Sequence, residues 1–411
     1  MHVLYFHQHF STPEGSTGTR SYEMAQTLLA RGHRVTMVCG SGQLASSGLG
    51  GAPVNGMRRG KVDGIDVVEL DLPYSNYDSF LKRAWIFLLF AWRSVLLALR
   101  ADCDLIFATS TPLTAGIPGI VMKLFRRKPF VFEVRDLWPE LPREMGVIRN
   151  PVVLKAMDVL EWLSYHVADA CIGLSPGIVK GITRRGIPAE RVCMIPNGCD
   201  LELFNPSLKS RLQDIPAVGK GDFVAVFCGA HGMANGLDAV LDAAKVLKER
   251  NQKDIKLLFV GDGKLKPGLQ ERARLQSLDN CIFCDPMPKH KLSKLTASVD
   301  VGLMILANVP AFYYGTSPNK FFDYIASGLP VLNNYPGWLA DIIEKHDCGV
   351  AVPPGEPEAF ADALVFLRDN RERREQMGEK ARGVAETQFD RPNLSNQFVS
   401  FLERCERDFS K

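Results

Sequence analysis

The sequence lacks the features that mark a secreted, membrane-spanning or disulfide-bonded protein. Its most apolar stretch, residues 80–99, is interrupted by Arg93 and falls short of the roughly 20 apolar residues that a spanning helix needs. Residues 1–6 run directly into an expected strand, so we expect mature sequence and no signal peptide. Without a leader, the ten cysteines indicate a reducing cytosol rather than a disulfide framework.

The sequence also has little net charge and no convincing metal-binding pattern. A net charge of +3 excludes no class of partner, and 46% apolar with 23% charged residues is typical of a soluble globular protein. Cys281 and Cys284 have metal-like spacing but no second pair, so we expect buried free thiols. Asp102-Cys-Asp104 leads into an expected strand. We therefore expect no metal site. We also expect no cofactor and no nucleic-acid partner.

Short apolar runs alternate with amphipathic helical stretches along all 411 residues, a length that indicates about two domains. This pattern predicts an α/β protein with two doubly wound, Rossmann-like domains, whose ligands bind at the carboxyl ends of the strands. We expect a first domain at 1–204, a linker at 205–222 and a second domain at 223–392. A final helix at about 393–411 is expected to pack back on the first domain. The Gly- and Ser-rich residues 40–60 predict a mobile loop.

The expected strands are short and apolar. In the first half they are Val3–Phe6, Val35–Val38, Ile65–Leu70, Leu105–Ala108, Phe130–Val134, Ala170–Ile172 and Val192–Ile195. In the second half they are Val224–Phe227, Lys256–Val260, Ile282–Phe283, Val299–Met304, Pro330–Leu332 and Val350–Val352.

Residues 317–331 form the most informative segment, a loop, a short helix and a buried strand in succession. Ser317 and Pro318 are expected at the N-cap and the first helical position. Free N–H groups at a helix N-terminus bind anions, and Lys320 adds a positive charge. Asp323, one turn later, is placed to hold ribose hydroxyls. Phosphate plus ribose indicates a nucleotide; an ordinary capped helix with a solvated acid is the alternative.

This segment resembles the C-terminal motif of retaining glycosyltransferases of family 4, which have the GT-B fold, and in particular the WbuB-like bacterial O-antigen and capsule group. Further matching segments occur in the same order along the chain. They are Pro13–Arg20, Ala30–Val35, Phe132–Glu140, Val192–Asp200, Phe227–Gly232 and Val260–Gly263.

The resemblance implies a set of site residues. Those expected to bind the donor nucleotide are Gly229, Gly232, Gly261, Gly263, Lys264, Met287, Ser317, Pro318, Asn319 and Asp323. Those expected at the reaction centre are Lys320, Arg135, Asp136 and His231, and those on the acceptor side are Gly15, Gly18 and Arg20. The chain departs from the family at Ala230, Asn235 and Gly315, where relatives have Arg, Lys and Glu. We expect Lys320, Lys264, Arg20 or Arg135 to supply the lost charge. A structural ion pair of Arg135 with Glu133 or Asp136 is the alternative.

Residues 80–99 predict an amphipathic helix at a membrane interface. At helical spacing Lys82, Arg93 and Arg100 form a basic line, and Phe87 and Leu88 lie on the far side. Trp85 and Trp92 suit the headgroup boundary. A buried helix of the first domain is the rival interpretation.

The expected function is transfer of a sugar, an N-acetylhexosamine or its 6-deoxy form, from a UDP-sugar to a polyprenyl-diphosphate-linked acceptor. The expected location is peripheral, at the cytoplasmic face of the inner membrane. A UDP-N-acetylglucosamine 2-epimerase-like enzyme and a non-catalytic membrane scaffold are the alternatives.

Overall fold

The computed structural model describes residues 1–42, 45–75, 77–208, 215 and 217–410, which form two compact units. The first unit comprises Met1–Pro196, Gly315–Ser317 and Pro392–Lys411. The second comprises Asn197–Tyr314 and Pro318–Arg391. Each unit has its own sheet and its own hydrophobic core.

The first unit is built on an eight-stranded sheet in the order β3-β4-β2-β1-β5-β6-β7-β8. All neighbouring pairs are parallel except β3–β4. The central strands are buried along their whole length, as expected for a parallel sheet covered on both faces. The strands are β1 (His2–Phe6), β2 (Arg34–Gly42), β3 (Met57–Val62), β4 (Ile65–Tyr74), β5 (Leu105–Thr109), β6 (Phe130–Val134), β7 (Ala170–Gly173) and β8 (Val192–Met194).

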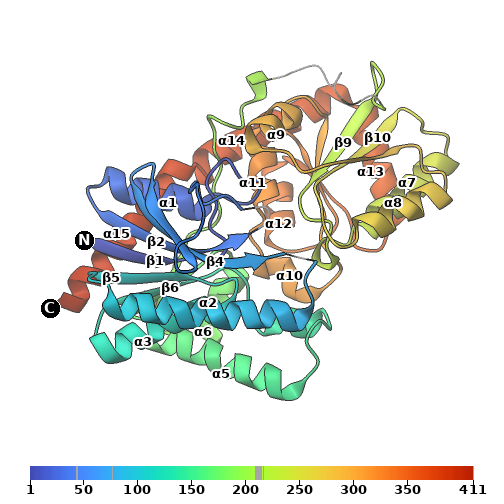
Figure 1. Cartoon of the computed structure of the whole chain (residues 1–411). Coiled ribbons are helices and arrows are strands. Elements are labelled where there is room, and N and C mark those ends of the chain that lie inside the picture. Colours follow the sequence, from blue (N-terminus) through green and yellow to red (C-terminus); the bar gives the residue numbers. More distant parts are fainter. Residues whose placement is uncertain (43–44, 76, 209–214, 216, 411) are drawn as a thin grey trace. The chain divides into compact units, whose positions relative to one another are not determined.

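Helices cover both faces of this sheet. Figure 1 shows α2, α3, α5 and α6 together on one face and α1 on the other. The C-terminal helix α15 (Arg391–Ser410) lies near the end of α1, where Arg31 donates hydrogen bonds to Ser400 and Glu403. Helix α15 also adds Phe398 and Leu402 to the core of the first unit. The other helices are α1 (Arg20–Ala30), α2 (Phe80–Arg100), α3 (Ile117–Arg126), α4 (Glu140–Glu144), α5 (Pro151–Val167) and α6 (Pro176–Arg184).

The second unit is built on a six-stranded, fully parallel sheet in the order β11-β10-β9-β12-β13-β14. Its strands are β9 (Phe223–Cys228), β10 (Ile255–Val260), β11 (Cys281–Cys284), β12 (Val301–Met304), β13 (Val331–Asn333) and β14 (Gly349–Ala351). Its helices are α7 (Asp238–Glu249), α8 (Lys266–Leu275), α9 (Lys289–Thr296), α10 (Pro310–Gly315), α11 (Asn319–Ala326), α12 (Trp338–His346), α13 (Pro357–Asp369) and α14 (Arg371–Gln388).

The two predicted Rossmann-like α/β domains are confirmed, and the structure differs from the sequence-based expectation in two places. Residues 40–60 are not one mobile loop, since β2 extends to Gly42 and β3 begins at Met57. Residues 197–204 belong to the second unit. The backbone of Cys199 forms a β-bridge with that of Asp390, and the Arg391 side chain donates a hydrogen bond to the Gly198 carbonyl. Part of the expected linker, residues 209–214 and 216, lies outside the described residues.

Candidate active site

In the second unit, the helix that carries Lys320 follows from its sequence. Phe321, Phe322 and Ile325 of α11 are buried, and Gly328 ends the helix with a left-handed φ of +66°. Pro318 rather than Ser317 is the N-cap residue of the helix, and the Pro318 side chain makes no capping hydrogen bond. The expected Ser317 cap is therefore wrong by one position. Lys320 is the second residue of the helix.

Lys320 reaches across to the loop that follows β9. Its Nζ donates to Asn235 Oδ1 at 2.6 Å and lies 4.2 Å from the centre of the Phe227 ring. Asn235 in turn donates through Nδ2 to the Ala230 carbonyl at 2.7 Å. Ala230 and Asn235, two positions where the resemblance implies a departure from the family, are thus linked through the Asn235 amide to the lysine of α11.

The charge of Lys320 has no carboxylate partner. Among the described residues, no ion pair within 4.0 Å involves Lys320. Burial lowers the pKa of its ammonium group to about 7, because an ammonium that loses water and gains no anion is destabilised. An anionic ligand would reverse this effect. Lys320 is the side chain of the second unit best suited to bind a phosphate.

Glycines hold the two loops beside Lys320 in close contact. A Cβ on Gly229 would lie 3.2 Å from Lys320 Cε, and one on Gly261 would lie only 1.9 Å from the Gly229 carbonyl oxygen. Gly261 also has a φ of +146°, which L-residues rarely adopt. A Cβ on Gly263 would collide with the His231 backbone, whereas Gly232 has open space around it. Gly229, Gly261 and Gly263 therefore allow the two loops beside Lys320 to pack closely, because a side chain at any of them would be in close contact with a neighbour.

His231 does not expose its imidazole as a catalytic residue would. Its side chain is fully buried, with the rings of Phe227, Phe259 and Phe283 at centroid distances of 5.9, 6.3 and 6.3 Å. Burial, with Lys266 nearby, lowers the pKa of His231 to about 4, so the imidazole is neutral. The structure corrects the catalytic assignment and makes His231 part of an aromatic cluster beneath the loops.

The lysine that organises the loop after β10 is Lys266 and not Lys264. Lys264 is exposed, and it makes no hydrogen bond or ion pair within the described part of the chain. Lys266 is buried, and its Nζ donates to the carbonyls of Gly261 and Cys284 and to Asp285 at 2.9–3.0 Å. Lys266 is the first residue of α8, and no sequence motif indicated that its side chain would be buried. Met287, half-buried after β11, remains a prediction.

Asp323 is more enclosed than a solvated carboxylate. It is 7% exposed, lies 3.6 Å from Lys289 Nζ, and has its pKa raised by burial against the lowering effect of Lys289. Lys289 itself lies over the Phe204 ring. Asn319 is half-buried at the first position of α11. The ribose-binding role of Asp323 stays a prediction, with Lys289 as a partner that the sequence did not indicate.

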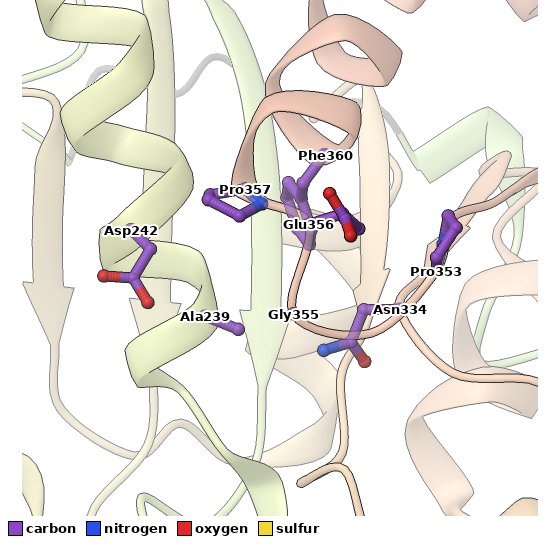
Figure 2. Close-up of a pocket in the computed structure, with 8 residues that line it drawn as sticks. All are labelled: Ala239, Asp242, Asn334, Pro353, Gly355, Glu356, Pro357 and Phe360. Carbon is purple, nitrogen blue, oxygen red and sulfur yellow. The ribbon is translucent and has the colours of Figure 1, made fainter.

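The second unit also has a small cavity of about 40 Å³ away from these loops. Figure 2 shows it between α7 and the loop that leads into α13. Its lining residues are Ala239, Asp242, Asn334, Pro353, Gly355, Glu356, Pro357 and Phe360. None of these is a predicted site residue, and Asp242 is already paired with Arg272. This cavity is not the candidate site.

In the first unit, Arg20 has a structural position. It begins α1 as expected, but its side chain is buried and pairs with Glu133 at 2.8 Å. It also donates to the carbonyls of Ile195 and Pro196. Because these contacts use four of its five N–H donors, Arg20 is corrected from a ligand-binding to a framework residue. Gly15 and Gly18 lie in the loop before α1, and their acceptor-side role stays a prediction.

Arg135 keeps side-chain donors for a ligand, because its guanidinium group hydrogen-bonds only to His7 among the described residues. Its partner is neither Glu133 nor Asp136, as the alternative interpretation expected, but His7, whose Nε2 lies 3.0 Å from Arg135 Nη1. Asp136 accepts from Thr111 Oγ1 at 3.3 Å, and burial raises the pKa of its carboxyl group. Arg135, His7 and Asp136 follow the carboxyl ends of β6 and β1.

Helix α2 has an exposed apolar stripe, but its composition differs from the prediction. The stripe consists of Leu81, Trp85, Leu88, Trp92 and Leu96, with Trp85 and Trp92 65% and 62% exposed. Phe87 instead stacks on Tyr74 at 5.6 Å, and Arg93 donates to the Gly56 carbonyl. Lys82 pairs with Asp78. The expected lipid contact of Phe87 and headgroup contact of Arg93 are therefore corrected.

Two other helices of the first unit, α3 and α5, also carry exposed apolar residues. Helix α3 contacts both α2 and α5. Exposed apolar residues on these two helices are Leu124, Phe125, Val152, Val159 and Trp162. In the described part of the chain, no helix is long and apolar enough to cross a membrane.

Comparisons with known proteins match both halves of the chain. Residues 15–198 match the family described as "Glycosyl transferase 4-like domain", and residues 209–384 match "Glycosyl transferases group 1". D-inositol 3-phosphate glycosyltransferase of Paenarthrobacter aurescens is 26% identical over 215 residues, 50% of each chain. The amylovoran biosynthesis glycosyltransferase AmsK of Erwinia amylovora is 22% identical over 221 residues, 53% of this chain and 52% of AmsK. The chain thus spans about half the length of these curated relatives.

Solved structures extend the similarity to nearly the whole chain at the level of the fold. Anabaena Alr3699/HepE, crystallised in complex with UDP-glucose, has a TM-score of 0.71 and 17% identity, and the match covers 98% of this chain and 100% of that one. The fold is therefore that of the GT-B glycosyltransferases. With both halves matched in order, the chain belongs to the glycosyltransferases that join a family 4-like domain to a group 1 domain.

Proposed function

We propose that this protein is a retaining glycosyltransferase that uses a UDP-sugar as donor and a polyprenyl-diphosphate-linked saccharide as acceptor. The sugar is an N-acetylhexosamine or its 6-deoxy form, and the product is an intermediate of surface polysaccharide such as O-antigen or capsule. The reaction takes place at the cytoplasmic face of the inner membrane, to which the protein binds peripherally.

Lys320 is the observation that carries the donor half of this proposal. The glycosidic bond to a diphosphate breaks only if the negative charge of the leaving group is stabilised. Lys320 is a cation without a carboxylate partner among the described residues, and it lies at the N-terminus of α11, where the helix dipole also favours an anion. The Asn235 contact fixes its ammonium group at the loop after β9.

The apolar surface on α2, α3 and α5 supports the acceptor half. Exposed tryptophan, leucine and phenylalanine side chains on three helices, of which α3 contacts the other two, are costly in water and indicate an interaction surface. Arg126 and Arg127 follow the exposed Leu124 and Phe125 of α3, and residues 79–101 contain no acidic residue. Apolar side chains with neighbouring cations fit the interface of an anionic membrane, where a polyprenyl chain would be anchored.

A transfer assay with a lipid-linked acceptor tests the proposal. The purified protein is incubated with a polyprenyl-diphosphate-linked N-acetylhexosamine and a panel of UDP-, GDP- and dTDP-sugars, and the products are analysed by mass spectrometry and NMR. We expect one UDP-sugar to give a product extended by one sugar, with the anomeric configuration of the donor retained. Conversion of UDP-N-acetylglucosamine without acceptor would indicate an epimerase, and failure to bind any nucleotide would indicate a scaffold.

A further inference from the structure

The strand order of the first unit defines where a ligand would bind in it. The chain moves from β1 to β2 on one side of the sheet, and β5 lies on the other side of β1. In open α/β sheets, ligands bind outside the carboxyl ends of the strands at such a switch point. His7 directly follows β1, Ser110 and Thr111 follow β5, and Arg135 follows β6.

Hydrogen bonds join these three strand ends. The Arg135 backbone N–H donates to Ser110 Oγ at 2.8 Å, and its guanidinium group lies 3.0 Å from His7 Nε2. Thr111 has a φ of +98°, a strained conformation for a β-branched residue. Backbone strain of this kind is concentrated at functional sites.

The Arg135 contact fixes the state of His7. A guanidinium group only donates hydrogen bonds, so Nε2 must be the acceptor and the proton must sit on Nδ1. Burial and the Arg135 charge hold the pKa of His7 well below its usual range, which agrees with a neutral ring. Within the described residues, Nδ1 and both polar atoms of the Gln8 side chain are buried and have no hydrogen-bond partner. The end of β1 therefore places buried polar atoms that can hydrogen-bond a ligand beside Arg135.

We infer that the switch point of the first unit is a diphosphate subsite in which Arg135 binds the anion and His7 is a positioning residue for Arg135. The neutral imidazole orients the guanidinium group without cancelling its charge, as a carboxylate would. Arg20, the other arginine nearby, is already neutralised by Glu133. Arg135 is half-buried, so its remaining donors can meet a ligand. The inference rests on the proposed function, in which the lipid acceptor and the UDP-sugar both carry a diphosphate.

Two substitutions at His7 separate positioning from packing. His7→Gln places an amide oxygen near the position of Nε2 and keeps an acceptor for Arg135, whereas His7→Leu fills similar space without one. We expect His7→Leu to raise the KM of one diphosphate substrate by about 10- to 100-fold, as for loss of a hydrogen bond to a charged group, with a much smaller change in kcat. His7→Gln should restore KM to within a few-fold of wild type. In an Arg135→Ala background, His7→Leu should have no further effect.

Substrate-specific readouts identify which diphosphate is bound. A rise in KM for the lipid acceptor, with an unchanged Kd for the UDP-sugar, assigns the subsite to the acceptor, and the reverse assigns it to the donor. Equal loss in folded His7→Gln and His7→Leu, or no loss in folded His7→Leu, would overturn the inference. Binding of inorganic pyrophosphate, measured by calorimetry in a Lys320→Ala background, needs no sugar transfer. Loss of this binding in His7→Leu would uphold the subsite even if the proposed transfer reaction failed.

Discussion

The contact between Lys320 and Asn235 shows how a neutral amide can position a lysine from another element. The family resemblance implies Lys where this chain has Asn235, and the Asn235 side chain accepts a hydrogen bond from Lys320 at 2.6 Å. The positive charge is supplied by α11, and the loop after β9 positions it. Because Asn235 is neutral, it leaves the charge of Lys320 available to an anion. Aspartate at this position would pair with the lysine and weaken diphosphate binding.

The lowered pKa of Lys320 predicts pH-dependent donor binding. With a pKa of about 7 in the free protein, Lys320 is protonated below pH 7 and neutral above it. A bound diphosphate favours the ammonium form, so binding above pH 7 takes up a proton and affinity falls by up to about tenfold per pH unit. The diphosphate diester of a UDP-sugar does not titrate in this range. Calorimetry from pH 6 to 9, in buffers of different ionisation enthalpy, measures both effects. Constant affinity without proton uptake would contradict a lowered Lys320 pKa that is coupled to donor binding.

Single-residue roles are predictable where the residue lies in a local motif. Lys320 stands out within its own helix, and the structure leaves its charge without a carboxylate partner among the described residues. The Asn235 contact spans 85 residues, and the Arg20–Glu133 pair spans 113, so no local pattern could indicate either. His231 lies between glycines, which suggested an exposed loop residue. The aromatic rings that bury it come from three separate strands.

At the scale of elements, the close contact between the loops after β9 and β10 predicts that a side chain at Gly261 destabilises the protein. A methyl group there would lie 1.9 Å from the Gly229 carbonyl oxygen, so the loops must separate. We expect Gly261→Ala to destabilise the protein by about 2–4 kcal/mol, from the clash together with the left-handed φ, and to weaken UDP-sugar binding.

Gly268 provides the matched control for Gly261. It lies in α8, and no atom lies within 4 Å of the place that a methyl group would take there, so Gly268→Ala should stabilise the helix by about 0.5–1 kcal/mol. Urea unfolding of both variants provides the comparison. A Gly261→Ala protein as stable as wild type would show that the two loops do not pack as described.

The exposed stripe of α2 predicts membrane binding by side chains that face away from the core. Replacing Trp85, Leu88 and Trp92 with Ser should weaken binding to anionic liposomes at least tenfold, because each side chain loses burial in the interface. The free energy of unfolding should change little. Co-sedimentation with liposomes and urea unfolding measure the two quantities.

Phe87 is the contrasting position on the same helix. Its ring stacks on Tyr74, so Phe87→Ala should lower the free energy of unfolding by about 2 kcal/mol and leave liposome binding intact. If the triple variant unfolds instead, the stripe belongs to a core. If it stays folded and binds liposomes as wild type does, the membrane contact lies elsewhere.

Regular elements are easier to predict than irregular ones because buried parallel strands are short apolar runs. Strand β6 has the predicted bounds, Phe130–Val134. Strand β3 was missed because its sequence is basic, as suits an edge strand. Asp63 and Gly64, both with positive φ, form the two-residue turn between β3 and β4 and were the available signal. On α2, Trp85, Leu88 and Trp92 are exposed as predicted, whereas Phe87 and Arg93 were misassigned. Periodicity gives the angle between side chains but not which of them meet the rest of the domain.

At the scale of the whole molecule, the charges proposed to bind the diphosphates are supplied by side chains of each unit. Lys320 in the second unit and Arg135 in the first are cations without a carboxylate hydrogen-bond partner among the described residues. We therefore expect sugar transfer to continue in excess EDTA, since the leaving group meets Lys320 and a helix N-terminus. An assay with EDTA, then with added magnesium or manganese, checks this. Complete loss that is restored by either metal would contradict it.

The central claim is that Lys320 stabilises the diphosphate leaving group, and kcat/KM for the UDP-sugar in three folded proteins tests it most directly. Lys320→Ala should remove about 2–4 kcal/mol of transition-state stabilisation, which lowers kcat/KM roughly 30- to 1,000-fold. The exposed Lys253→Ala variant, in the loop before β10, carries the same charge change and should match wild type within about twofold, as expected for a solvated surface charge. Equal activity of all three proteins, or equal losses in both variants, would contradict the account.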